Sequence, residues 1–114
     1  MESSAILYLK DMLSAVNKVL VAAESFENIN DLRKNSLLFD IIIMNLVVIA
    51  EIDQKLGDNS KQVFSFIAWE KIKLFKDQIQ SDYFELDLKI IWLVITEHLP
   101  LLKSKLEKIV NDIN

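Results

Sequence analysis

The chain has 114 residues, of which 52% are hydrophobic, with one glycine, one proline and no cysteine. This length suits one domain, so we expect a single helical domain over residues 1–114. The shortage of turn residues favours long helices, and we predict an all-α, antiparallel up-and-down bundle of four main helices, with room for a short extra helix. Because cysteine is absent and His98 is the single histidine, disulfides and metal sites built on nitrogen or sulfur ligands are excluded.

The formal net charge of −4 argues against general DNA binding. The first residues have no basic region and carry Lys10 and Asp11 inside an apolar stretch, so they do not resemble a secretory signal. The most apolar run, residues 41–50, is far shorter than the roughly 20 residues of a membrane span. We therefore expect a cytoplasmic protein with no membrane and no DNA partner.

The first half of the chain predicts two helices. In the first, Ser3 or Ser4 can cap the start, and apolar residues recur at steps of three and four: Ile6, Leu9, Leu13, Val16 and Leu20. The second is expected to begin at an Asn30 or Asp31 cap and to run to about Leu56, with Gly57 in the left-handed position after its end. This helix is apolar nearly all round, so we expect it to be buried on more than one side, at the bundle centre or in a subunit interface.

The second half predicts a loop and two more helices. GDNSKQ, residues 57–62, is the clearest loop, and helical spacing then runs from Phe64 to about Ile79. Asp87 is the expected cap of the last helix. Pro100 lies inside this helix, so we expect a kink near Thr96.

The second half also carries a family resemblance. From Trp69 to Trp92 the string WEKIKLFKDQIQSDYFELDLKIIW resembles, without a gap, the typical run W-R-E-I-I-G-M-R-N-R-L-I-H-G-Y-F-G-V-D-L-E-I-V-W of the HepT-like branch of the HEPN superfamily. Further similarity lies in ILYLKDMLSAVNKV, in LFDIIIMNLVVIAEIDQKL and in the tail HLPLLKSKLEKI. The resemblance covers nearly the whole chain.

The resemblance implies a ribonuclease scaffold and a set of partners. HepT-like proteins are the HEPN halves of two-gene toxin-antitoxin modules, pair with an MNT-type minimal nucleotidyltransferase and work as homodimers. Their signature is R-x-x-x-x-H-x-Y, in which Arg can hold the scissile phosphate and His can move a proton during metal-independent RNA cleavage. In the best-known pairs the partner silences the toxin by adding AMP to the Tyr.

Carried over residue by residue, the Arg position falls on Lys76, the His position on Ser81 and the Tyr position on Tyr83. Lysine keeps the charge but loses the bidentate fork that fits a phosphate. Serine has no titration near neutral pH and cannot replace an imidazole. We therefore interpret Lys76 and Ser81 as degenerate, inactive catalytic positions, and only the tyrosine is intact.

The second helix supports this interpretation. Met44 stands where the family typically has an Arg, whereas Asn45 and Glu51 are kept. In an apolar helix these two polar residues would cost roughly a few kcal/mol if buried without partners. We expect them to line a seam of the bundle and to bond to polar groups of neighbouring helices, ahead of a surviving role in an active site.

Other candidate residues can also be explained by a structural role. Tyr83 could accept AMP, but it is expected mainly to close the end of the bundle with its hydroxyl in water. Phe84 and Trp92 are expected in the core or an interface. Lys73 and Lys76 share a helix face and could touch phosphate, although charged helix positions are usually solvated. His98 is expected to be structural.

Three functions follow from these observations. The first is a catalytically degenerate binding or regulatory component paired with the nucleotidyltransferase, needing no cofactor or metal. The second is an active ribonuclease toxin in which Lys76 and Ser81 do weakened work on RNA. The third is a helical dimer with an unrelated scaffold role. The missing Arg and His favour the first, and hence a protein that is not an enzyme.

Overall fold

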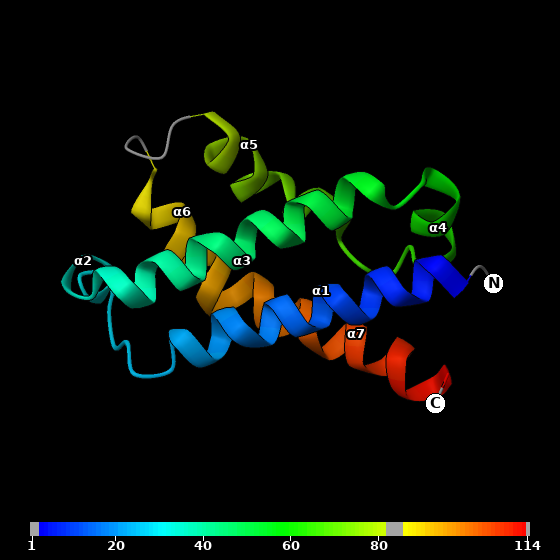
Figure 1. Cartoon of the computed structure of the whole chain (residues 1–114), viewed down its shortest axis with the longest axis horizontal. Helices are drawn as coiled ribbons and strands as arrows, with labels where there is room; N and C mark the ends of the chain where they lie inside the picture. The colour runs from blue at the N-terminus through cyan, green and yellow to red at the C-terminus, as the bar shows by residue number, and fades with distance from the viewer. Residues whose placement is uncertain (1–2, 82–85, 114) are drawn as a thin grey trace.

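The computed structural model describes residues 3–81 and 86–113, and these residues form an all-α bundle without a strand. The long helices α1 (Ser3–Ala22) and α3 (Ser36–Lys55) lie side by side and run in opposite directions (Figure 1). The last helix, α7 (Leu99–Ile113), packs against α1 and runs opposite to it. The predicted fold class is therefore confirmed.

The core forms where the apolar stripes of these three helices meet. The buried positions recur at steps of three and four, so each helix turns one face inward. Each large apolar side chain buried there contributes roughly 1.5–3 kcal/mol relative to exposure. Side chains with no exposed surface in α1, α3 and α7 include Leu9, Met12, Val16, Val19, Ile42, Leu46, Ile49 and Leu106.

The predicted second helix is divided into α2 (Asp31–Lys34) and α3 at Asn35. The backbone of Asn35 is extended, with φ −131° and ψ 93°, and its side chain accepts a 3.1 Å hydrogen bond from the Leu38 amide. The prediction of one helix from Asn30 or Asp31 to Leu56 was therefore wrong, because Asn35 competes for the backbone donor and caps a new helix.

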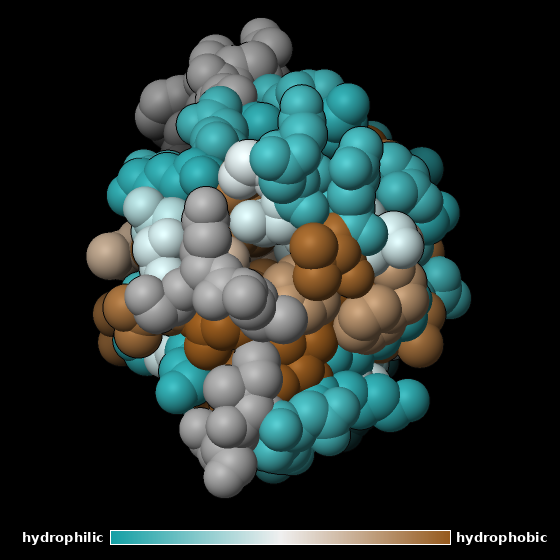
Figure 2. All heavy atoms as spheres, turned by 90° about the vertical axis from the view of Figure 1, so that its right-hand side faces the viewer, coloured by the Kyte–Doolittle hydropathy of each residue, from teal (hydrophilic) through white to brown (hydrophobic). Residues whose placement is uncertain are grey.

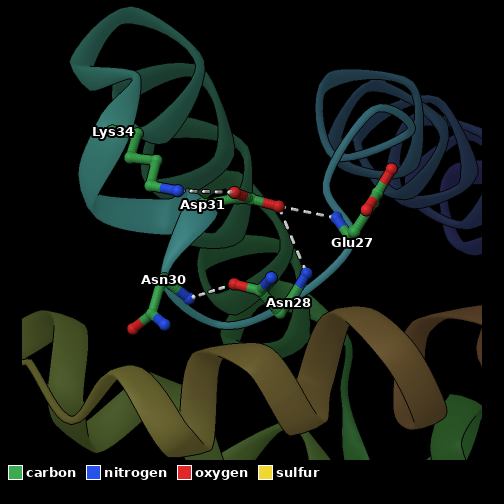
Figure 3. A network of polar contacts seen from close by, with 5 residues as sticks. All are labelled: Glu27, Asn28, Asn30, Asp31 and Lys34. Carbon is green, nitrogen blue, oxygen red and sulfur yellow. Dashed lines mark hydrogen bonds and ion pairs between the residues drawn. The ribbon is translucent and has the colours of Figure 1, made fainter.

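Asp31 stabilises the turn that joins α1 to α2 (Figure 3). Its carboxylate accepts backbone hydrogen bonds from Glu27 at 2.7 Å and Asn28 at 3.2 Å, and Lys34 lies 3.8 Å away. The Asn30 amide donates to the side chain of Asn28 at 3.0 Å. The two backbone hydrogen bonds, with a smaller contribution from Lys34, hold the pKa of Asp31 below its ordinary value of 3.8.

Gly57 does not take the predicted left-handed conformation. Its φ is −74° and its ψ is 163°, and it precedes a short helix, α4 (Asp58–Val63), in the segment predicted to be a loop. Both predictions were wrong because Leu56, which is buried and extended, already ends α3 and redirects the chain. Asp58 in the first turn of α4 favours the new helix.

The predicted third helix is also shorter than expected. It consists of a 3₁₀ turn, η1 (Trp69–Lys71), followed by α5 (Lys73–Ser81), and the preceding segment is not helical. The indole N–H of Trp69 donates to the carbonyls of Lys61 and Phe64, at 3.2 Å each. These bonds give the carbonyls at the end of α4 a partner outside a helix, so the chain can turn there.

The last predicted helix begins at its expected cap. The carboxylate of Asp87 accepts from the Lys89 amide at 2.9 Å and starts α6 (Leu88–Leu93). A π-helical segment, η3 (Val94–His98), then leads into α7, and the ribbon changes direction between α6 and α7 (Figure 1). Pro100 has no N–H to donate into the preceding turn. Thr96, near which we expected the kink, lies in η3.

One end of the molecule carries α4 and both chain ends. Figure 2 shows polar side chains around an apolar area at the middle of this end. Exposed apolar residues in and just after α4 include Val63, at 61%, and Phe66, at 49%. Within residues 3–81 and 86–113, no helix has the length and apolar character of a membrane span.

Candidate functional site

Lys76 lies on the side of α5 that faces α3. Its neighbour Phe75 is 1% exposed, so this part of α5 is held against the core. Lys76 is one turn after the buried Ile72 and therefore sits at the edge of the same face. Its ammonium nitrogen is 3.6 Å from Oδ2 of Asp53, and its side chain is 18% exposed.

Asp53 is the buried charge to which Lys76 is paired. It lies near the end of α3 with 3% of its surface exposed, and no other charged or polar side chain is classed as buried in the part of the chain that the structure describes. A second ammonium group, from Lys61 of α4, lies 3.0 Å from its Oδ1. Two ammonium groups thus share one carboxylate. A buried charge needs such partners, because it is costly to bury alone.

Trp69 positions the second lysine of this cluster. Besides the two backbone carbonyls that its indole N–H reaches, its ring has the Lys61 ammonium 5.8 Å from the centroid. This distance is within the range of a cation–π interaction. We call Asp53, Lys61 and Lys76, with Trp69 beside them, the Asp53 cluster. It connects α3, α4, η1 and α5.

Sequence reasoning identified Lys76 but missed Asp53 and Lys61. A signal was present for Asp53, because it continues the buried stripe of Leu46 and Ile49 at helical spacing. A carboxylate on the core face of a helix needs a positive partner. Lys61 carried no such signal, because its segment had been taken as a loop.

The remaining motif positions lie at the end of α5 and beyond it. Ser81 is the last residue of α5, and Tyr83 and Phe84 lie outside the described residues. The two sides of this segment are linked by a 2.7 Å hydrogen bond from the Asp87 amide to Oε1 of Gln78. The start of α6 is thereby fixed close to the last turns of α5.

Asn45 and Glu51 do not join the Asp53 cluster among the described residues. Asn45 is half-buried, and its amide donates to the carbonyl of Ile41 in the same helix at 2.8 Å. Glu51 is exposed to solvent. The expected bonds to neighbouring helices are replaced for Asn45 by this bond within α3, a common solution for a short polar side chain in a helix. Within residues 3–81 and 86–113, no group of three or more acidic or histidine side chains could hold a metal ion.

Comparison with known proteins gives the family. The family model described as "Ribonuclease HepT-like" matches residues 11–109. This span includes the Asp53 cluster and all three motif positions. The chain therefore belongs to the HepT-like ribonuclease family, and the resemblance stated from the sequence is confirmed.

Individual relatives are distant. A protein of Thermococcus cleftensis named "Probable ribonuclease HepT" is 28% identical over 60% of this chain and 62% of its own length. "Gamma-glutamylcyclotransferase and putative RNase MJ0434" of Methanocaldococcus jannaschii is 24% identical over 92% of this chain and 50% of its own length. "Putative RNase MJ1380" of the same organism is 21% identical over 88% and 91%. The chain thus matches less than two thirds of the first two relatives, and no solved structure matches it.

Proposed function

We propose that this HepT-like protein is a binding or regulatory component without the ribonuclease chemistry of its family, acting in the cytoplasm beside an MNT-type nucleotidyltransferase. The pairing of Lys76 with Asp53 carries this proposal. Lys76 stands at the position that corresponds to the phosphate-holding Arg, yet its ammonium is 3.6 Å from a buried carboxylate and its side chain is 18% exposed. Its charge is used within the fold, and lysine also lacks the fork of Arg.

The position of the family's histidine supports the same proposal. Ser81 ends α5, and a serine hydroxyl does not exchange a proton near neutral pH as an imidazole does. Attack by a ribose 2′-hydroxyl needs a group that accepts its proton. Without that group, the scaffold can bind a partner but has no means of cleaving RNA at a useful rate.

An RNA cleavage assay tests this proposal. Purified protein incubated with a mixture of structured and single-stranded RNA should leave the RNA intact, whereas Lys76→Arg combined with Ser81→His should produce cleavage. Wild-type cleavage that is lost in Lys76→Ala but kept in Lys73→Ala would overturn the proposal. Lys73 is the matched control because it lies on the same helix and is exposed.

An active ribonuclease is the second candidate, and one observation favours it. Lys61 and Lys76 share the single carboxylate of Asp53, so the cluster retains one positive charge that could hold a phosphate. In that case RNA is the substrate and Lys76 and Ser81 are the catalytic positions. Growth arrest when the protein is expressed without its partner would favour this candidate.

A homodimer is part of the proposal. The outward face of α3 carries Leu37 and Met44, which are 69% and 67% exposed, and Val48, which is 38% exposed. These residues follow one another at helical spacing and so form one apolar strip, and contiguous exposed apolar surface is typical of an interaction site. A dimer with only a scaffold role would show this same strip but would not co-purify with a nucleotidyltransferase.

The nucleotidyltransferase also supplies a test for Tyr83. We propose this tyrosine as the acceptor of AMP, because it is the one motif position that is intact. Co-expression with a nucleotidyltransferase encoded beside it should yield a complex and an added AMP on Tyr83, seen by peptide mass spectrometry. A Tyr8→Phe variant should retain the modification and Tyr83→Phe should lose it.

A further inference from the structure

A small cavity lies between the segment around η1 and α5 and the segment around η3 and α7. Its volume is about 80 Å³, and it has an open mouth. Its apolar walls include Ile72 and Phe75 from one segment and Leu99 and Leu102 from the other. All four side chains are buried, so the walls are held by the core rather than by mobile surface groups.

The polar side chains that line this cavity are basic. His98 lines it, and the Nε2 atom of His98 is buried without a hydrogen-bond partner among the described residues. Lys71, which is exposed, and Lys105, which is half-buried, also line it, and no acidic residue is among the lining residues that the structure describes. A buried nitrogen without a partner is uncommon in native structures and calls for an explanation. Here the nitrogen belongs to a residue of a cavity whose two charged lining residues are both lysines.

We propose that this cavity binds a short-chain aliphatic carboxylate. The alkyl chain enters the apolar space, and the carboxylate accepts hydrogen bonds from Nε2 of His98 and from the ammonium groups of Lys71 and Lys105. The size limits the alkyl chain to about three carbons, because a cavity of about 80 Å³ is about half the roughly 150 Å³ space that holds benzene. An inorganic anion would leave the apolar walls unused.

The residues that line this cavity include no member of the Asp53 cluster. Lys71 belongs to η1 and lines the cavity, whereas Lys76 pairs with Asp53. Ile72 and Phe75 connect the two, because they line the cavity and hold the start of α5. A ligand in the cavity would therefore stabilise the segment that carries Lys76.

The test is a titration of the isotope-labelled protein followed by two-dimensional amide NMR, with butyrate as the probe. Butyrate should shift the amides of residues around His98 and Lys71. Butyramide, of the same length but uncharged, should bind roughly tenfold more weakly because it loses the charge-assisted bonds. Acetate, which has the charge but no chain, should not saturate in the same range.

Variants separate this site from unspecific binding. Lys105→Gln should weaken butyrate binding about two- to fivefold, as expected for a partly exposed ion pair, and Lys108→Gln at an exposed position of α7 should leave it unchanged. His98→Phe should weaken butyrate binding as well, with folding checked by the dispersion of the amide spectrum. Equal binding of butyrate and butyramide, or no change in Lys105→Gln, would overturn the proposal. Absence of any butyrate binding would overturn it too. If Ala68→Leu then changes the oligomeric mass, the cavity belongs to a contact with a second copy instead.

Discussion

The ammonium group of Lys76 lies 3.6 Å from the buried carboxylate of Asp53, so this lysine is held by an ion pair inside the bundle. Lys61 approaches the other carboxylate oxygen to 3.0 Å. A phosphate that bound Lys76 would have to compete with this buried carboxylate. The lysine that we propose as the counterpart of the family's Arg is therefore part of an ion-pair cluster within the bundle.

The first prediction concerns Asp53. Replacing it by Ala removes the shared partner of two lysines, which are 25% and 18% exposed and can turn toward water. We expect the free energy of unfolding to fall by about 1–3 kcal/mol, less than the 3–5 kcal/mol typical when a fully buried partner is left alone. Urea denaturation followed by circular dichroism measures the change. Glu51→Ala, an exposed site on the same helix, should change stability by less than about 0.5 kcal/mol.

The converse substitution is more severe. Combining Lys61→Met with Lys76→Met leaves Asp53 buried without a positive partner. We expect a loss of about 3–5 kcal/mol near neutral pH, greater than the loss from either single substitution. If the double variant is as stable as the wild type, the two ion pairs do not support the fold.

The second prediction is a pH dependence from Asp31. Hydrogen bonds from the backbone amides of Glu27 and Asn28 lower its pKa below 3.8. A carboxyl group with a lowered pKa in the folded state stabilises the fold above the unfolded pKa, and this stability is lost as pH falls through the folded pKa. Asp31→Asn should therefore lower Tm at pH 7 and at pH 5, and the difference from wild type should shrink below pH 3.8. Thermal unfolding from pH 7 to pH 3 checks this, with Glu24→Gln as an exposed control.

The third prediction concerns the packing of α5. Phe75 is 1% exposed and Leu74 beside it is 38% exposed. Phe75→Ala should cost about 3–5 kcal/mol of unfolding free energy because it leaves a cavity in the core. Leu74→Ala should cost less than about 1 kcal/mol. Similar losses at the two positions would show that α5 does not pack as described.

The fourth prediction tests the apolar strip on α3. Met44→Glu places a charge at the middle of the strip, where Met44 is 67% exposed. The monomer should keep its folding stability, whereas the dimer should dissociate. Light scattering after gel filtration should give the mass of a dimer for wild type and of a monomer for the variant. Leu101→Glu on α7, also exposed at 62%, should remain dimeric. A wild type that is monomeric at all concentrations would contradict the assignment.

Local signals predicted much of the fold but failed at the connections. The apolar stripes located the long helices, and Asp87 was correctly predicted as a cap because its carboxylate accepts a bond from an amide two residues away. The break at Asn35 and the helix after Gly57 were missed. At each of these points a buried side chain or a competing side-chain bond outweighed the local preference of the chain, as tertiary context often does.

The candidate site was predicted in part, because the resemblance pointed to Lys76 and Ser81 but not to what surrounds them. Residues 57–62 were predicted to be a loop, so nothing in them indicated that Lys61 would lie against Asp53. The spacing around Trp69 predicted a continuous helix. In the structure the indole of Trp69 donates hydrogen bonds to two backbone carbonyls, and the helix is interrupted there. These contacts join residues from separate elements, so no periodic pattern in the sequence indicates them.

By itself the sequence determined the helical class, the positions of the long helices and the membership of the HepT-like family. Helical spacing and apolar burial act over a few residues, so both can be recognised in the sequence. Only the tertiary structure decided that Asp53, Lys61 and Lys76 form one cluster. A buried carboxylate requires positive partners, but which lysines reach it depends on how three helices pack together.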